Sequence, residues 1–149
     1  ENPELYAIFP FRLYGVGKPE LDLAIQTFVT RKFRSDIGWQ HSSIQAASLG
    51  LAREAADMVY NKFSTSDNEC RFPAFWGPNY DWSPDQDHGN VAMIALQRMI
   101  LQYEGDSLIT FPAWPDQWDV DFRLRAPVGN IQGSSVDGRR HTETVSISK

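Results

Sequence analysis

A change in hydrophobic period at Leu108 constrains the fold of this chain more than any other feature. Before it, apolar side chains recur at helical spacing in three segments, which lie near residues 19–34, 42–63 and 89–106. Each segment has the spacing that places its apolar residues on one face of a helix. The sequence therefore predicts three amphipathic helices before Leu108.

After Leu108 the pattern is that of β-strands. Residues 108–111 form a short apolar run, and residues 120–125 and 143–148 alternate between apolar and polar side chains. The dipeptide Asp137-Gly138 is typical of a hairpin turn. We therefore expect a small antiparallel β unit at the C-terminal end.

Together these patterns predict a mainly α fold in two parts, residues 1–106 and residues 107–149. The three helices are too few to close a helical ring, yet each has an apolar face that needs a partner. We infer that the missing partner helices belong to an upstream portion of a longer chain.

Composition excludes several classes of function. The 14 basic residues are outnumbered by 19 acidic ones and form no stripe, so nucleic acid and anionic membranes are not expected partners. The single cysteine, Cys70, excludes an internal disulfide framework. No apolar run has the length of a membrane span, and the first residues do not resemble a signal peptide. No cofactor is expected, and a neutral ligand suits this composition better than a charged one.

Residues 75–90 have the composition of a sugar-binding loop. This stretch contains prolines and glycines without any hydrophobic period, so it predicts an irregular loop before the third helix. Mutual repulsion among its aspartates, Asp81, Asp85 and Asp87, favours an acid/base role for one of them. Its large aromatic side chains are candidates for stacking on a sugar ring: Trp76, Tyr80 and Trp82. The alternative is a polar loop in which Asp87 or Asn90 only caps the next helix.

A second candidate site precedes the second helix. Trp39 and His41 lie in a short loop, where Trp39 offers a stacking face and His41 a hydrogen-bonding group. The alternative for His41 is a purely structural role. His41, Asp85, Asp87 and His88 are also possible metal ligands, but their spacing matches no recognised motif, so no metal site is predicted.

Short motifs along the chain resemble the C-terminal part of glycoside hydrolase family 95 and its bacterial relatives. They occur in the same order and with similar spacing up to about Gly129. The motifs are Leu5-Tyr6 with Phe9-Pro10, Pro19-Glu20-Leu21, Gly38-Trp39, Asp87 with Gly89 and Asn90, Met99-Ile100-Leu101-Gln102, Pro112-Ala113-Trp114-Pro115 and Leu124-Arg125-Ala126-Pro127.

The resemblance implies a fold and a reaction. Enzymes of this family have a six-hairpin (α/α)6 barrel followed by a β domain, and they cleave α-L-fucosides or α-L-galactosides with inversion. Residues 1–106 would be the last barrel helices with their active-site loops, and residues 107–149 the β tail. The resemblance also implies a bacterial enzyme that is periplasmic or secreted.

The resemblance also assigns roles to single residues. An inverting hydrolase needs one carboxyl group as acid and a second to activate water. The resemblance makes Asp87 the base-side carboxylate and places the general acid, a glutamate, upstream of Glu1. Because His88 is inserted into the family's Asp-Gly-Asn motif, Asp85 stays an alternative base, and His88 and Asn90 are candidate substrate contacts.

Two other functions fit part of the pattern. In a non-catalytic carbohydrate-binding or structural fragment, the aspartates would only accept hydrogen bonds from sugar hydroxyls. In a glycoside phosphorylase, basic side chains would bind phosphate near Asp87. Residues 75–91 contain no Lys or Arg, which favours hydrolysis over phosphorolysis.

Overall fold

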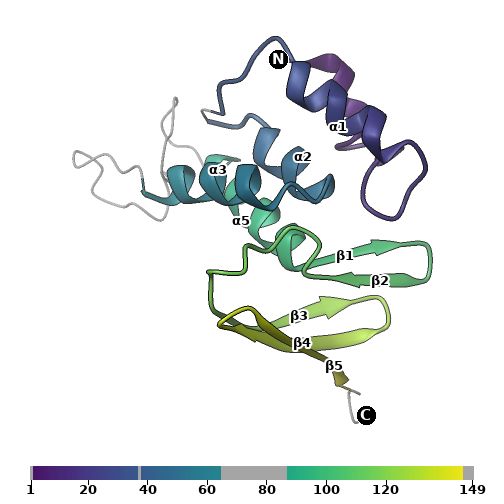
Figure 1. Cartoon of the computed structure of the whole chain (residues 1–149), viewed down its shortest axis with the longest axis vertical. Coiled ribbons are helices and arrows are strands. Elements are labelled where there is room, and N and C mark those ends of the chain that lie inside the picture. The colour runs from purple at the N-terminus through teal and green to yellow at the C-terminus, as the bar shows by residue number, and fades with distance from the viewer. Residues whose placement is uncertain (1, 37, 65–86, 146–149) are drawn as a thin grey trace. The chain divides into compact units, whose positions relative to one another are not determined.

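The computed structural model describes residues 2–36, 38–64 and 87–145. The chain divides into two compact units, Glu1–Ala113 and Trp114–Lys149. The described residues of the first unit form a 3-10 helix, η1, four α-helices and a two-stranded sheet (Figure 1). Its elements are η1 (Pro3–Ala7), α1 (Leu21–Thr30), α2 (Ser42–Ser48), α3 (Ala52–Ser64), α5 (Asp87–Ile100), β1 (Leu101–Glu104) and β2 (Ser107–Thr110).

Helix α2 is the buried centre of the first unit. All seven of its residues are buried, and α3 and α5 both pack against it. Most of its side chains are alanine or serine, which lets the neighbouring helices approach closely. Two of its buried polar side chains bond to backbone: Ser48 Oγ donates to the Ile44 carbonyl (2.8 Å), and Gln45 Nε2 donates to the Leu5 carbonyl (3.4 Å). The fully buried side chains around it include Leu5, Ile8, Phe28, Leu49, Val59 and Met99.

The second predicted helix is two helices, because Gly50 interrupts it. Gly50 adopts a left-handed backbone conformation with φ of 78°, which a glycine tolerates best. A Cβ at this position would lie 3.0 Å from Val16 Cγ2 and 3.2 Å from the Pro112 carbonyl oxygen. The prediction of one continuous helix over residues 42–63 was therefore wrong at this point.

The third predicted helix is also shorter than expected. It ends at Ile100, and Leu101–Glu104 pairs as an antiparallel strand with Ser107–Thr110. Gly105, which was expected to end the helix, lies in the turn of this hairpin with φ of 57°. The strand at residues 108–111 was predicted, but its partner was missed because Leu101–Glu104 continues the apolar pattern of the helix.

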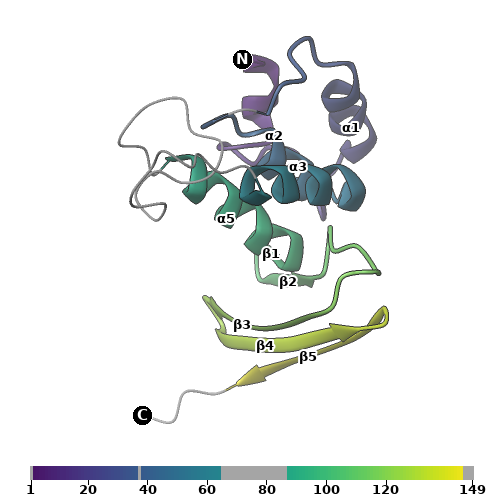
Figure 2. The same ribbon diagram turned by 90° about the vertical axis from the view of Figure 1, so that its left-hand side faces the viewer.

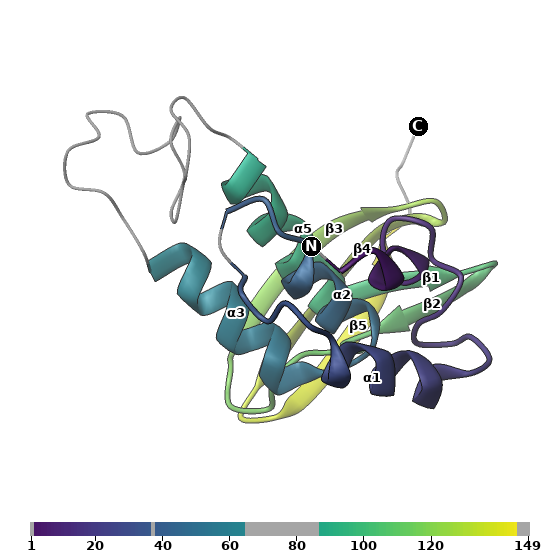
Figure 3. The ribbon, with the colours of Figure 1, turned by 90° about the horizontal axis from the view of Figure 1, so that it is seen from above.

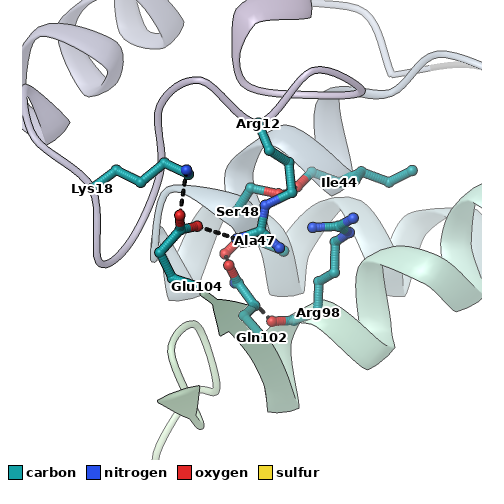
Figure 4. A network of polar contacts seen from close by, with 8 residues as sticks. All are labelled: Arg12, Lys18, Ile44, Ala47, Ser48, Arg98, Gln102 and Glu104. Atoms are coloured by element: carbon teal, nitrogen blue, oxygen red, sulfur yellow. Dashed lines mark hydrogen bonds and ion pairs between the residues drawn. The ribbon is translucent and has the colours of Figure 1, made fainter. Parts of the chain in front are cut away.

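Gln102 fixes this transition from helix to strand. Its side chain is 1% exposed, and its amide nitrogen donates to the carbonyl oxygens of Ala47 in α2 (2.7 Å) and Arg98 in α5 (2.9 Å). Nearby, Glu104 pairs with Lys18 and with Arg12 (Figure 4). The start of β1 is thus tied to both neighbouring helices by one buried amide.

These observations overturn the predicted fold class. Among the described residues, about 40% are helical and about 25% lie in strands, so the protein is a mixed α and β structure rather than a mainly α one. The expectation of a partial (α/α)6 barrel is corrected with it. In addition, Pro3–Ala7 forms η1, and the first helix covers Leu21–Thr30, which is shorter than the predicted range of residues 19–34.

The second unit contains a three-stranded antiparallel sheet. Its strands are β3 (Val120–Ala126), β4 (Gly129–Val136) and β5 (Arg139–Val145), in the order β3-β4-β5 (Figure 2). The strand at residues 120–125 and the hairpin turn at Asp137-Gly138 are confirmed. Strand β4 was not predicted, because Gly133, Ser134 and Ser135 interrupt its apolar pattern. The buried side chains of the second unit include Trp114, Phe122, Ala126 and Ile131.

Helix length and hydropathy were also compared with the requirements of a membrane span. None of the helices in the described part of the chain is both long enough and apolar enough to cross a membrane.

Gly50 and Gly105 give a test of the helix break. Both have positive φ, but a Cβ at Gly105 would meet no atom within 4 Å. We expect Gly105→Ala to lower the free energy of unfolding by roughly 1–2 kcal/mol, the cost of the backbone conformation. Gly50→Ala should cost roughly 2–3 kcal/mol because its Cβ also crowds Val16 and Pro112. Urea unfolding measures both values, and equal losses would contradict the crowding at Gly50.

Candidate functional site

Trp39 and His41 line the same pocket, and their predicted role as sugar contacts stays a prediction. The pocket is formed by the N-terminal segment with η1, the loop between α1 and α2, and the start of α2. The Trp39 side chain is 40% exposed, so part of the indole ring faces solvent. The lining residues are Asn2, Tyr6, Phe33, Trp39, Gln40, His41, Ser42 and Gln45.

His41 is the centre of an aromatic cluster beside this pocket. Its ring lies edge-on to Phe9, with centroids 5.1 Å apart and an angle of 80°. Its ring also meets Trp39 edge-on at 6.2 Å and 74°. Arg98 of α5 lies over the Phe9 ring, with its guanidinium carbon 5.2 Å from the ring centroid. Such edge-to-face contacts hold the imidazole and indole rings in defined orientations.

The N-terminal segment closes the pocket through two hydrogen bonds to Phe33. Asn2 Nδ2 donates to the Phe33 carbonyl oxygen (2.7 Å), and the Phe33 N–H donates to Asn2 Oδ1 (2.9 Å). Each polar atom of the Asn2 amide keeps one further hydrogen-bonding position, because the nitrogen has two hydrogens and the oxygen two lone pairs. Asn2 therefore both builds the wall and offers a polar group to a ligand.

The loop between α1 and α2, which carries Trp39 and His41, is anchored by Lys62 of α3. The ammonium nitrogen donates to the carbonyl oxygens of Asp36 (3.0 Å) and Gly38 (2.8 Å), and it lies 3.6 Å from Asp36 Oδ1. Figure 3 shows this loop running alongside α3. The Lys62 side chain is only 1% exposed and the Asp36 side chain 12%, so the pair is shielded from water.

Burial changes the ionisation of both groups. Loss of solvation raises the pKa of the Asp36 carboxyl group to about 6, although the nearby Lys62 ammonium and the Ser43 backbone amide offset part of this effect. Burial also lowers the pKa of Lys62, and the Asp36 carboxylate opposes that change. Lys62 Nζ lies 3.6 Å from Asp36 Oδ1, an ion-pair distance that is longer than a normal hydrogen bond. The carboxylate is therefore costly to bury in its charged form.

The chemistry of the pocket is neutral hydrogen bonding beside aromatic surface. Its described lining combines amides, two hydroxyl groups, an imidazole and three aromatic rings, and contains neither a carboxylate nor a Lys or Arg. Stacking surface next to amide donors and acceptors is typical of sites that bind polar, uncharged ligands. This lining can position a ligand, but it supplies no pair of carboxyl groups for hydrolysis.

Asp87 and Asn90 lie elsewhere in the fold, in the first turn of α5. Both residues are exposed, and the Asp87 carboxylate is placed where it interacts favourably with the positive end of the helix dipole. His88 belongs to the same turn, but its side chain lies outside the described residues. Asp85, Trp76, Tyr80 and Trp82 lie outside them entirely. Their predicted roles, and the choice between Asp85 and Asp87, stay predictions.

Several pocket residues were missed by sequence reasoning. Tyr6, and Phe9 beside the pocket, were marked only by their motif in the resemblance. Asn2 and Gln45 carried no signal, since their roles depend on contacts with residues 31 and 40 positions away. Lys62 is an ordinary charged residue of an amphipathic helix by its sequence pattern alone.

The described residues contain no group of three or more His, Cys, Asp or Glu side chains arranged to hold a metal ion.

Comparison with known proteins assigns this chain to no family. The chain matches no protein-family model, and searches of curated proteins and of solved structures return no match either. Its function must therefore be argued from the residues of the pocket.

The buried Asp36 carboxyl group predicts a pH dependence of stability. Its folded-state pKa is raised, so its contribution is fully present below pH 4 and is lost as pH rises toward 6. Between pH 4 and pH 7, we expect wild type to lose about 2–3 kcal/mol relative to Asp36→Asn, the value of a shift of this size. Urea unfolding at several pH values measures this difference.

Asp57→Asn is the matched control for this experiment, because Asp57 is an exposed aspartate on α3. A pH dependence of the same size in the Asp57→Asn comparison would show that burial of Asp36 is not its cause.

Proposed function

We propose that this chain binds a neutral carbohydrate in the Trp39–His41 pocket, as part of a bacterial inverting glycoside hydrolase that is periplasmic or secreted. The observation that carries the proposal is the partly exposed Trp39 indole beside a lining of uncharged amides and hydroxyl groups. The flat indole face suits the apolar face of a sugar ring, and the amides suit its hydroxyl groups. The sequence resemblance favours an α-L-fucoside or an α-L-galactoside.

The hydrolytic step would need two carboxyl groups on opposite sides of the glycosidic bond. In this proposal, Asp87 activates the attacking water, with Asp85 as the alternative. Asp87 is not among the residues that line the pocket, so the pocket would hold a sugar unit beside the cleaved bond rather than the bond itself. The general acid is a glutamate upstream of this chain, so the chain alone binds sugar without completing the reaction. Attack by the activated water on the anomeric carbon, with protonation of the leaving oxygen by the acid, gives the inverted hemiacetal and the free alcohol.

A non-catalytic carbohydrate-binding role is the second candidate. The observation in its favour is that no carboxylate belongs to the described pocket lining. In that case Trp39 and His41 would serve recognition alone, and Asp87 would stabilise the start of α5 through the helix dipole.

Substitutions at Trp39 and Asp87 separate these functions. In the full-length parent protein, we expect Asp87→Asn to reduce the rate of hydrolysis of 4-nitrophenyl α-L-fucoside or α-L-galactoside at least about 100-fold, because no base would activate water. Trp39→Ala should instead weaken binding of the same glycosides roughly tenfold, since the stacking surface is lost. Initial-rate kinetics and equilibrium binding give the two quantities.

Asp57→Asn and Trp118→Phe serve as controls for charge and for loss of an indole outside the pocket. Binding without hydrolysis in the wild-type parent would support the non-catalytic function and overturn the hydrolase. Unchanged binding in Trp39→Ala would overturn the pocket as the sugar site.

A further inference from the structure

We propose that Lys62 is a positioning residue for the Trp39–His41 site. By donating hydrogen bonds to backbone carbonyl groups, Lys62 holds the loop between α1 and α2 in its ligand-binding conformation. This inference rests on the proposed function for the identity of the ligand. The anchoring itself rests on contacts that involve no ligand.

The position of Lys62 allows it to fix the loop next to Trp39. Lys62 reaches the loop from a separate helix, 24 positions further along the chain than Gly38, and it bonds to carbonyl oxygens on both sides of residue 37. Gly38 immediately precedes Trp39, so the ammonium group fixes the peptide that orients the indole ring. With its carbonyl held and its φ at 61°, Gly38 defines the direction in which the chain leaves toward α2.

Burial of the Lys62 ammonium group has an energetic cost that its contacts with the loop offset. A lysine is rarely buried to 1% exposure, because burial removes water from its charged ammonium group. In a helix that needed only a core contact, an apolar side chain would avoid this cost. The buried charge is therefore explained best by the two carbonyl oxygens and the carboxylate that it holds, all of which belong to the loop.

Other contacts hold the two ends of this loop. Its beginning is held by Arg31, whose Nη1 donates to the Phe28 carbonyl oxygen (2.7 Å) and whose guanidinium group stacks on the Phe28 ring. The His41 carbonyl oxygen accepts from the Gln45 N–H at the first turn of α2 (2.9 Å). Between these two ends, Lys62 donates the side-chain hydrogen bonds to Asp36 and Gly38, immediately before Trp39.

Lys62→Met tests the anchor, because it keeps the length of the side chain and removes its donors. By amide hydrogen exchange, we expect exchange at Trp39, Gln40 and His41 to rise at least about tenfold, while the buried amides of α2 and α5 keep their rates. The matched control is Arg53→Met, an exposed basic residue of the same helix. Unchanged exchange at Trp39 in a folded Lys62→Met variant would overturn the proposal.

Lys62→Gln is the second variant, since its amide nitrogen keeps two N–H donors without a charge. It should show exchange at Trp39 between that of wild type and that of Lys62→Met. If neither variant folds while Arg53→Met does, Lys62 supports the whole unit rather than the loop, and the proposal is overturned.

A double-mutant cycle with Trp39→Ala separates positioning from general stability. With methyl α-L-fucoside as the probe, we expect Lys62→Met and Trp39→Ala each to weaken binding about tenfold, and the double variant no more than either alone. Multiplied losses would mean that Lys62 acts independently of Trp39, which overturns the positioning role. If wild type binds no sugar, the proposed function fails, and the exchange experiment still decides the anchoring.

Discussion

The first unit depends on the complete burial of α2, a short helix that is not apolar. Four of its seven side chains carry hydroxyl or amide groups, and every one of its residues is buried. Burying polar groups is favourable only when they find partners, and Ser48 and Gln45 find them in backbone carbonyl groups. The rest of the unit is arranged around this helix: α3 and α5 pack on it, and Gln102 ties it to the first strand.

This burial explains why part of the fold was predictable and part was not. Hydrophobic spacing correctly marked Ile44, Ala47, Ala55 and Val59 as core residues, because they face a neighbouring helix. The same method does not recognise polar core residues such as Ser43 and Gln45. It also does not distinguish the end of α5 from the strand that follows, since Leu101 is buried in either conformation. The antiparallel hairpin, and with it the mixed α and β class, depends on tertiary pairing that overrides local pattern.

Some residues of the candidate site were likewise predictable from the sequence, and others were not. Trp39 and His41 were predictable because a tryptophan and a histidine close together in a loop suggest a ligand site, and the structure brings them onto one pocket. Asn2 bonds to Phe33, and Phe9 contacts the His41 ring, across more than thirty positions of sequence. No local pattern announces such contacts. Lys62 is the extreme case, since its sequence context is that of any exposed lysine on an amphipathic helix.

The uncharged lining of the pocket has a consequence for how a ligand would be selected. Among the residues described around it, none carries a full charge that would attract a ligand over a distance. Association would then be governed by diffusion and shape, with little dependence on ionic strength. Discrimination between similar sugars would arise after the encounter, in how long each one stays bound. Such a pocket would discriminate between ligands by residence time rather than by association rate.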